Sequence, residues 1–333
     1  MNFNKTALAL AVAGITAAAP IAAQADGSVY ASVRIGVWSG DISGDGVDNT
    51  ELRSFSSRFG VKGETDLGNG MTGFGKYEWD VDFNRDSRAG RTNEDDIGIR
   101  QRIVGVKGDF GKITLGQTYH TFYNYVVGPT DIPWWFSGYT MISYRGRTDD
   151  AISYDYSSGA FNFGVSAYFI ADANVPADSE DAVDQLEVGA SFGIGDTTLA
   201  VAIQTTEADL AAGTGTLIGL ASDEDILGLA WTGIMLGGSS WGFGLQTQDE
   251  DMSFLVDVVI GNAYVHVEAE SLDAASKGNT LGDRDRLGIT LGYTQTLGKD
   301  TKIYYEFHTL DEDTGNSNDD KTAVMAVLYY NLL

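Results

Sequence analysis

Hydrophobic and polar side chains alternate along residues 57–80, SRFGVKGETDLGNGMTGFGKYEWD. In an extended chain Arg58 and Lys62 fall on one face, whereas Phe59 and Val61 fall on the other. The alternation resumes after the turn-forming letters DLGNG, so the stretch predicts two antiparallel strands joined by a tight turn. The resulting sheet has one polar and one apolar side. The period alone leaves open which side faces outward, because a soluble barrel turns its charges to water, whereas a membrane barrel turns its apolar side to lipid.

The same two-residue period recurs along the rest of the chain, and no helical pattern of any length competes with it. About sixteen strand-like segments are predicted, at residues 28–39, 52–64, 70–82, 96–108, 111–121, 148–157, 160–171, 182–194, 196–206, 223–234, 238–248, 252–260, 262–272, 284–297, 300–310 and 321–333. The connections between them alternate between short turns and mostly long loops. This is the arrangement of an up-and-down meander whose long loops all leave from one end.

The number of strands bears on which side of the sheet faces outward. A barrel of eight strands can fill its interior with side chains, but one of about sixteen encloses an aqueous channel. The polar face is therefore predicted to face inward and the apolar face to meet lipid. Two soluble β-sandwiches in tandem are the alternative, although they would need a linker near the middle of the chain, and none stands out.

The first 25 residues predict export. Met1–Lys5 form a short positive segment, residues 6–19 form an apolar run, and Pro20 ends that run. The letters AQA that follow match a small-residue cleavage site, so we predict that a signal peptide is removed after Ala25. A single transmembrane barrel domain is then predicted over residues 26–333, in the outer membrane of a bacterial cell.

The composition excludes several classes of protein. The formal net charge of −26 argues against a nucleic-acid partner, which would need a basic patch. An aromatic content of 11% together with the sustained alternation excludes a disordered acidic protein. Only 4 prolines suit long paired strands, because each proline would remove a ladder donor. No stretch after the signal peptide has about 20 uninterrupted apolar residues, so no transmembrane helix is predicted.

Three stretches of the chain resemble a known family. The stretch SRFGVKGETDLGNGMTGFGKYEW resembles the second and third strands of general bacterial porins, the trimeric 16-stranded diffusion channels of the outer membrane. RQRIVGVKGDFGKITLGQTYHTFYNYV, at 100–126, resembles their fourth and fifth strands and the start of their third loop, and RTDDAISYDYSSGAFNFGVSAYF, at 147–169, resembles the sixth and seventh strands. The second half of the chain matches only in its strand rhythm. The resemblance implies an all-β, 16-stranded antiparallel up-and-down transmembrane β-barrel with an inward-folded third loop, assembled as a homotrimer.

In this family, arginines on the barrel wall face acidic residues on the third loop, at the narrowest part of the channel. The resemblance places wall arginines at Arg58, Arg100 and Arg147. Arg34 falls where the family often has another basic residue on the first strand. Arg102 is two residues after Arg100, so we expect it to point the same way. A solvated strand end is the ordinary alternative for an arginine, but a mid-strand cation needs a hydrated lumen or a carboxylate partner.

The resemblance also implies the loop side of this constriction. Asp131, in GPTDIPWWFSG, would be the acid on the third loop. Trp134 and Trp135 stand where the family usually carries a second acid. Two roles are open for these tryptophans, since they could narrow the channel or pack the loop against the wall. With the five arginines, these three residues form the predicted pore constriction.

No catalytic, cofactor or metal site is predicted. His120, His266 and His308 are far apart in the sequence, which argues against a zinc motif, and no phosphate-binding or dinucleotide-binding glycine pattern opens a helix. The acidic loops at 40–51 and 311–320 suggest divalent cations bridging to lipopolysaccharide phosphates, but neither has EF-hand spacing. Solvated loops are the alternative. Mixed charges in the second long loop, between 85 and 96, suggest a latch to a neighbouring subunit.

Passive diffusion of small hydrophilic solutes and ions through a water-filled channel is the predicted function. A substrate-selective channel is one alternative. An outer-membrane hydrolase and a structural surface barrel are alternatives from other classes, and a stable conductance in a planar bilayer would distinguish a channel from both.

Overall fold

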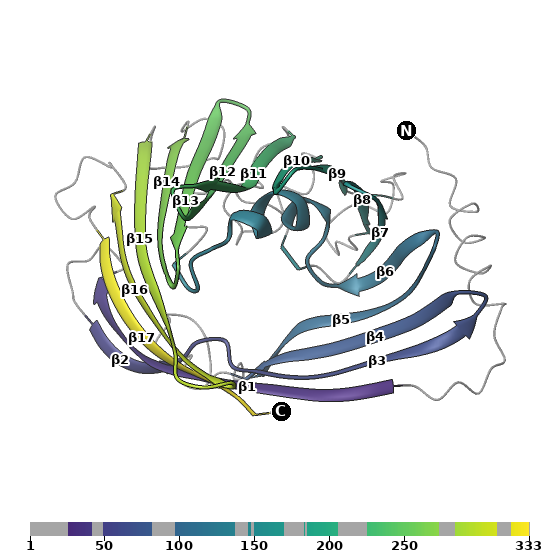
Figure 1. Cartoon of the computed structure of the whole chain (residues 1–333), viewed down its shortest axis with the longest axis horizontal. Coiled ribbons are helices and arrows are strands. Elements are labelled where there is room, and N and C mark those ends of the chain that lie inside the picture. The colour runs from purple at the N-terminus through teal and green to yellow at the C-terminus, as the bar shows by residue number, and fades with distance from the viewer. Residues whose placement is uncertain are drawn as a thin grey trace, which may run out of the picture.

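The computed structural model describes residues 26–41, 49–81, 97–136, 146–147, 150–169, 183, 185–205, 225–272, 284–311 and 321–332. Antiparallel strands form a ring that closes where β1 pairs with β17 (Figure 1). The strands are β1 (Asp26–Asp41), β2 (Asn49–Ser54), β3 (Arg58–Gly68), β4 (Met71–Val81), β5 (Ile97–Gly108), β6 (Gly111–Gln117), β7 (Ala151–Ser158), β8 (Phe161–Tyr168), β9 (Gln185–Ile194), β10 (Thr197–Gln204), β11 (Ile226–Leu236), β12 (Ser239–Gln248), β13 (Asp251–Ile260), β14 (Ala263–Leu272), β15 (Arg284–Thr296), β16 (Thr301–Asp311) and β17 (Lys321–Asn331).

Two of these segments are halves of one strand, because β2 and β3 both pair with β1. Ile35 pairs with Ser54 and Ser32 pairs with Arg58, so three residues of the second strand oppose two residues of β1. The extra residue is accommodated at Ser56, whose φ is 59°. The barrel therefore has sixteen strands, as predicted, and the second predicted strand is interrupted rather than continuous.

The orientation of the sheet is that of a membrane barrel. Phe59 and Val61, on the apolar side of the opening pattern, are 40% and 38% exposed on the outer surface. Glu78, from the polar side of the same hairpin, is only 3% exposed. Large apolar side chains are likewise exposed on strands around the ring, for example Val29 on β1 and Leu328 on β17. This reverses the arrangement of a soluble protein and suits a barrel surrounded by lipid.

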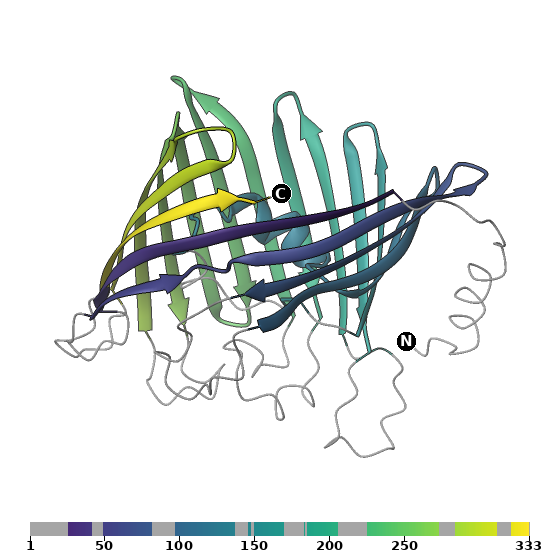
Figure 2. The ribbon, with the colours of Figure 1, turned by 90° about the horizontal axis from the view of Figure 1, so that it is seen from below.

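Tight turns join successive strands at one end of the barrel, where Figure 2 shows the hairpins. In the turn between β3 and β4, Gly68, Asn69 and Gly70 have φ values of 79°, 53° and 76°. Glycine and asparagine adopt this left-handed region at the lowest cost. No helix within the described ranges is both long enough and apolar enough to cross a membrane.

Several predicted features lie outside the described residues. These are the signal peptide at 1–25, the charged latch segment at 85–96, and most of the acidic loop residues, at 42–48 and 312–320. They stay predictions.

The third loop runs inside the barrel. After β6 the chain forms a π-helical turn, η3 (Tyr123–Val127), followed by a 3-10 turn, η4 (Gly128–Thr130), and Figure 1 shows this coil within the ring. Phe122 and Val126 are fully buried in a cluster with apolar side chains of β10 and β11. A Cβ atom on Gly228 of β11 would lie 2.8 Å from a carbon atom of each of them, so the glycine leaves the space that the coil occupies. The predicted inward fold is confirmed for the described part of the loop, up to residue 136.

Candidate functional site

Three predicted arginines meet on one wall of the lumen. Arg34 comes from β1, Arg58 from β3 and Arg100 from β5, and each interacts electrostatically with the other two. The closeness follows from strand order, because β3 lies between β1 and β4, and β4 pairs with β5. This wall carries positive charge toward the interior of the barrel.

Carboxylates are interleaved with these arginines. The Arg100 Nε atom lies 2.9 Å from Glu78 Oε1, and the Arg100 Nη1 atom lies 3.7 Å from Asp80 Oδ2. Glu78 also contacts Lys76 Nζ at 3.0 Å and accepts a hydrogen bond from the Tyr30 hydroxyl at 2.7 Å. The sequence prediction left Glu78 and Asp80 out of the constriction, although the alternation along β4 already put both on the polar face. Local pairing therefore offsets part of the positive charge of the wall.

The register corrects the prediction for Arg102. Arg100 forms a bulge in β5, because the pairing with β4 skips from Ile99 to Gln101. The alternation after the bulge is shifted by one residue. Arg102 is exposed and pairs with Tyr77, which lies on the outward face of β4. The prediction that Arg102 points the same way as Arg100 is therefore wrong.

Arg147 and Asp131 are connected through two tyrosines that the sequence prediction missed. The Arg147 guanidinium carbon lies 4.6 Å from the centre of the Tyr119 ring, and its Nη1 donates to the Tyr119 hydroxyl at 2.8 Å. Tyr119 stacks on Tyr123 with 3.6 Å between ring centres. The Tyr123 hydroxyl in turn donates to Asp131 Oδ2 at 3.0 Å. This series of contacts holds a cation and an anion along the third loop.

Trp134 and Trp135 pack against the barrel wall. Trp134 stacks on Tyr304 of β16, with 4.7 Å between ring centres and 10° between ring planes. Trp135 meets Phe55 edge-on at 4.9 Å. Both tryptophans remain half-buried. The packing role is thus supported, and a role in narrowing the channel stays a prediction.

Two buried wall carboxylates hold the backbone of the loop. Glu187 of β9 accepts the Phe122 N–H at 2.8 Å. Glu306 of β16 accepts the N–H groups of Trp135 at 3.1 Å and Phe136 at 3.2 Å, and it also accepts that of the preceding residue. A loop inside a barrel has no ladder partner for these donors, and a carboxylate is a strong acceptor. Neither contact has a local signal in the sequence, because the partners are 65 and 170 positions apart.

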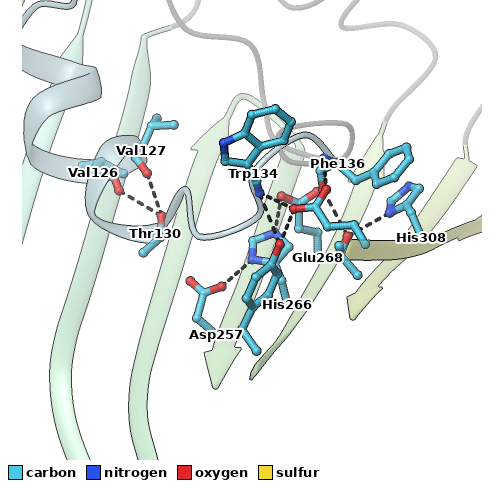
Figure 3. A network of polar contacts seen from close by, with 12 residues as sticks. Val126, Val127, Thr130, Trp134, Phe136, Asp257, His266, Glu268 and His308 are labelled. Carbon is cyan, nitrogen blue, oxygen red and sulfur yellow. Dashed lines mark hydrogen bonds and ion pairs between the residues drawn. The ribbon is translucent and has the colours of Figure 1, made fainter. Parts of the chain in front are cut away.

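A row of polar side chains across β13 to β16 supports the same region of the loop (Figure 3). His266 lies between Asp257 and Glu268, with each ring nitrogen 2.5 Å from a carboxylate oxygen. Thr290 donates to the Phe136 carbonyl at 3.0 Å and lies 2.9 Å from His308 Nδ1. The register thus places His266 on β14 and His308 on β16, on either side of β15, and each histidine pairs with Thr290 of that strand. Within the described ranges, no group of three or more histidine, cysteine, aspartate or glutamate side chains could hold a metal ion.

The comparison with known families fits this architecture. Residues 6–332 match the family model described as Gram-negative porin. The chain belongs to this family. Membership places it in the outer membrane, as predicted from the signal peptide and the strand pattern.

Curated relatives of this porin include the major outer membrane protein P.IB of Neisseria meningitidis serogroup B. It is 34% identical over 121 residues, which cover 34% of this chain and 33% of the relative. The P.IB protein of Neisseria gonorrhoeae is 32% identical over 122 residues. These matches span about a third of the length of the curated relatives.

Solved structures of other bacterial proteins share this fold. The anion-selective porin from Comamonas acidovorans superposes with a TM-score of 0.68 at 17% identity, covering 93% of this chain and 100% of that one. The trimer form of OmpT from Vibrio cholerae gives a TM-score of 0.64 at 16% identity, covering 92% and 99%. At these identities the likeness shows the fold, which is that of a closed 16-stranded barrel.

Proposed function

We propose that this porin is a passive diffusion channel for small hydrophilic solutes and ions. The observation that carries the proposal is the third loop, which crosses the inside of a 16-stranded barrel and is bonded to its wall by Glu187 and Glu306. A barrel of this size encloses water rather than a packed core. A loop fixed inside the barrel narrows the channel without blocking it.

The constriction combines charges from the wall and the loop. Its proposed members are Arg34, Arg58, Arg100, Glu78 and Asp80 on the wall, together with Arg147, Asp131, Trp134 and Trp135. Arg102 is excluded by its outward position. This set holds four arginines and three carboxylates, and Lys76 lies beside Glu78, so the net fixed charge proposed for the constriction is small and positive. Weak and salt-dependent ion selectivity follows from that near balance.

A homotrimer is the proposed assembly, supported by the likeness to the trimer form of OmpT. The acidic loops and the charged latch segment would then face lipopolysaccharide and neighbouring subunits, with divalent cations bridging acidic groups to phosphates. Native mass measurement in mild detergent is the test of the assembly. A stable monomer would contradict it.

The channel itself is tested in a planar bilayer. Purified, folded protein is expected to insert in discrete conductance steps that stay open, and liposomes that contain it are expected to swell in small sugars. A folded protein that produces no stable open steps would overturn the proposed function and would favour a hydrolase or a structural barrel.

A further inference from the structure

The tip of the third loop, defined here as Trp134, Trp135 and Phe136, lies against two arginines of the wall. The Arg34 guanidinium carbon is 5.8 Å from the centre of the Trp134 ring. The Arg53 guanidinium carbon is 5.5 Å from that of the Trp135 ring. The loop presents aromatic faces to these cations, and cations are attracted to such faces.

Arg53 is the more enclosed of the two arginines. It projects inward from β2, and only 9% of its surface is exposed. Its guanidinium carbon lies 4.7 Å from the Trp38 ring centre and 5.0 Å from the Phe55 ring centre, besides the contact with Trp135. Its Nη1 atom pairs with Glu51 Oε1 at 2.9 Å. A buried cation is costly unless its surroundings compensate for the lost water.

The third ring of this cage belongs to the loop and the other two belong to the wall. Trp38 and Phe55 are almost fully buried and pack in one cluster with Phe136 and wall residues of β17. The cage around Arg53 is therefore complete only when the loop tip is seated. The planar guanidinium suits this arrangement, because it stacks on aromatic faces, which an ammonium does less well.

We propose that Arg53 is a positioning residue that seats the third loop through the side chain of Trp135, and so sets the width of the pore without lining it. The inference rests on the proposed channel function. Glu306 holds the same tip through backbone N–H groups, which any residue other than proline would supply. Arg53 instead contacts the aromatic side chain of Trp135, so its contribution depends on which residue stands at that position.

The pairing with Glu51 allows a test without a change of net charge. The double variant Arg53→Met/Glu51→Gln removes one cation and one anion together. The matched control is Lys107→Met/Glu64→Gln, an exposed ion pair of 2.7 Å on β5 and β3 that does not touch the loop tip. Single-channel conductance, switching between conductance levels and the size limit for sugars in liposome swelling are measured on folded protein.

The Arg53→Met/Glu51→Gln channel is expected to switch into levels of higher conductance, in which the loop tip has left its seat. The ratio of seated to unseated states should fall about tenfold, which corresponds to about 1.4 kcal/mol. Arg53→Lys should restore part of the seated state, because it keeps the charge but loses the planar stack. The control should behave as the parent. Folded double-variant channels with the parent's conductance, switching and size limit would overturn the inference.

A second variant changes the loop side of the contact between Arg53 and Trp135. It tests the inference even if the arginine variants fail to fold. Trp135→Leu leaves the wall intact and is expected to produce the same levels of higher conductance. Adding Arg53→Met to Trp135→Leu should then change little more, whereas two fully additive effects would refute a direct contact. A parent protein that does not conduct at all would contradict the proposed function instead, so the two failures are distinguishable.

Discussion

Replacing Glu78 by glutamine should shift the ion selectivity of the channel toward anions. Glu78 lies within the arginine wall and accepts contacts from Arg100, Lys76 and Tyr30. Glutamine has nearly the same shape and keeps an oxygen that can accept the Tyr30 hydrogen bond. The substitution therefore removes one negative charge with little change in packing.

The size of the shift follows from Coulomb's law. A unit charge acting on an ion about 6 Å away in water contributes about 0.7 kcal/mol, and screening at 0.1 M salt reduces this to about 0.4 kcal/mol. The change has opposite signs for cations and anions, so the ratio of anion to cation permeability should rise about fourfold. At 1 M salt, where the Debye length is about 3 Å, the same arithmetic leaves a factor of about 1.4. These factors are lower bounds, because water in a narrow lumen screens less than bulk water.

Reversal potentials under a KCl gradient measure this ratio directly. Parent and Glu78→Gln channels are compared at mean concentrations near 0.1 M and 1 M. Glu64→Gln serves as the control, because Glu64 belongs to an exposed ion pair with Lys107 and is more than half exposed. A shift of less than about twofold at 0.1 M would refute the charge assignment at the constriction. So would a shift toward cations, or one of equal size at both concentrations.

Three further predictions concern the same channel. The parent should prefer cations at low salt, where the acidic loops act over a long range, and this preference should weaken or reverse toward anions near 1 M; a constant cation preference in reversal potentials would contradict it. Deleting Gly128–Phe136 should raise both conductance and the size limit for sugars while the barrel still forms, and unchanged conductance would mean that the loop does not narrow the pore. Gly228→Ala should destabilise the protein by about 1 kcal/mol in thermal denaturation, because its Cβ atom would meet Phe122 and Val126 at 2.8 Å. Gly75→Ala, with no atom closer than 3.5 Å, is the control, and equal melting temperatures would contradict the packing account.

The strands could be predicted from the sequence because the pattern that identifies each strand lies within that strand and its adjoining turns. Alternation, turn residues and spacing are local, so the sixteen predicted segments match the observed strands apart from their ends and the break in the second one. The irregularities at Ser56 and at Arg100 could not be predicted in this way. A single extra residue, at Ser56 or at Arg100, changes no composition and no local propensity. Its effect on Arg102 appears only when the two strands are paired.

The candidate site was predicted in part. Arg34, Arg58 and Arg100 meet on one wall, as the resemblance to porins implied. Glu187 and Glu306, the acids that hold the loop, could not be predicted, because the residues around them in the sequence do not indicate a contact with the loop. The same applies to Arg53, whose role depends on an aromatic ring 82 positions away.

The seat of the loop tip also bears on the order in which the molecule assembles. Trp38 and Phe55 lie near the beginning of the chain, whereas Met325 and Val327 lie on the last strand, and all four line one cluster. The seat is complete only when β1 pairs with β17 and the barrel closes. Before closure the loop tip can meet Tyr304 and Glu306 of β16, but it lacks part of the cluster that the two ends of the chain form together. A barrel arrested before closure should therefore leave aromatic side chains of the loop tip partly uncovered, where folding factors can bind them.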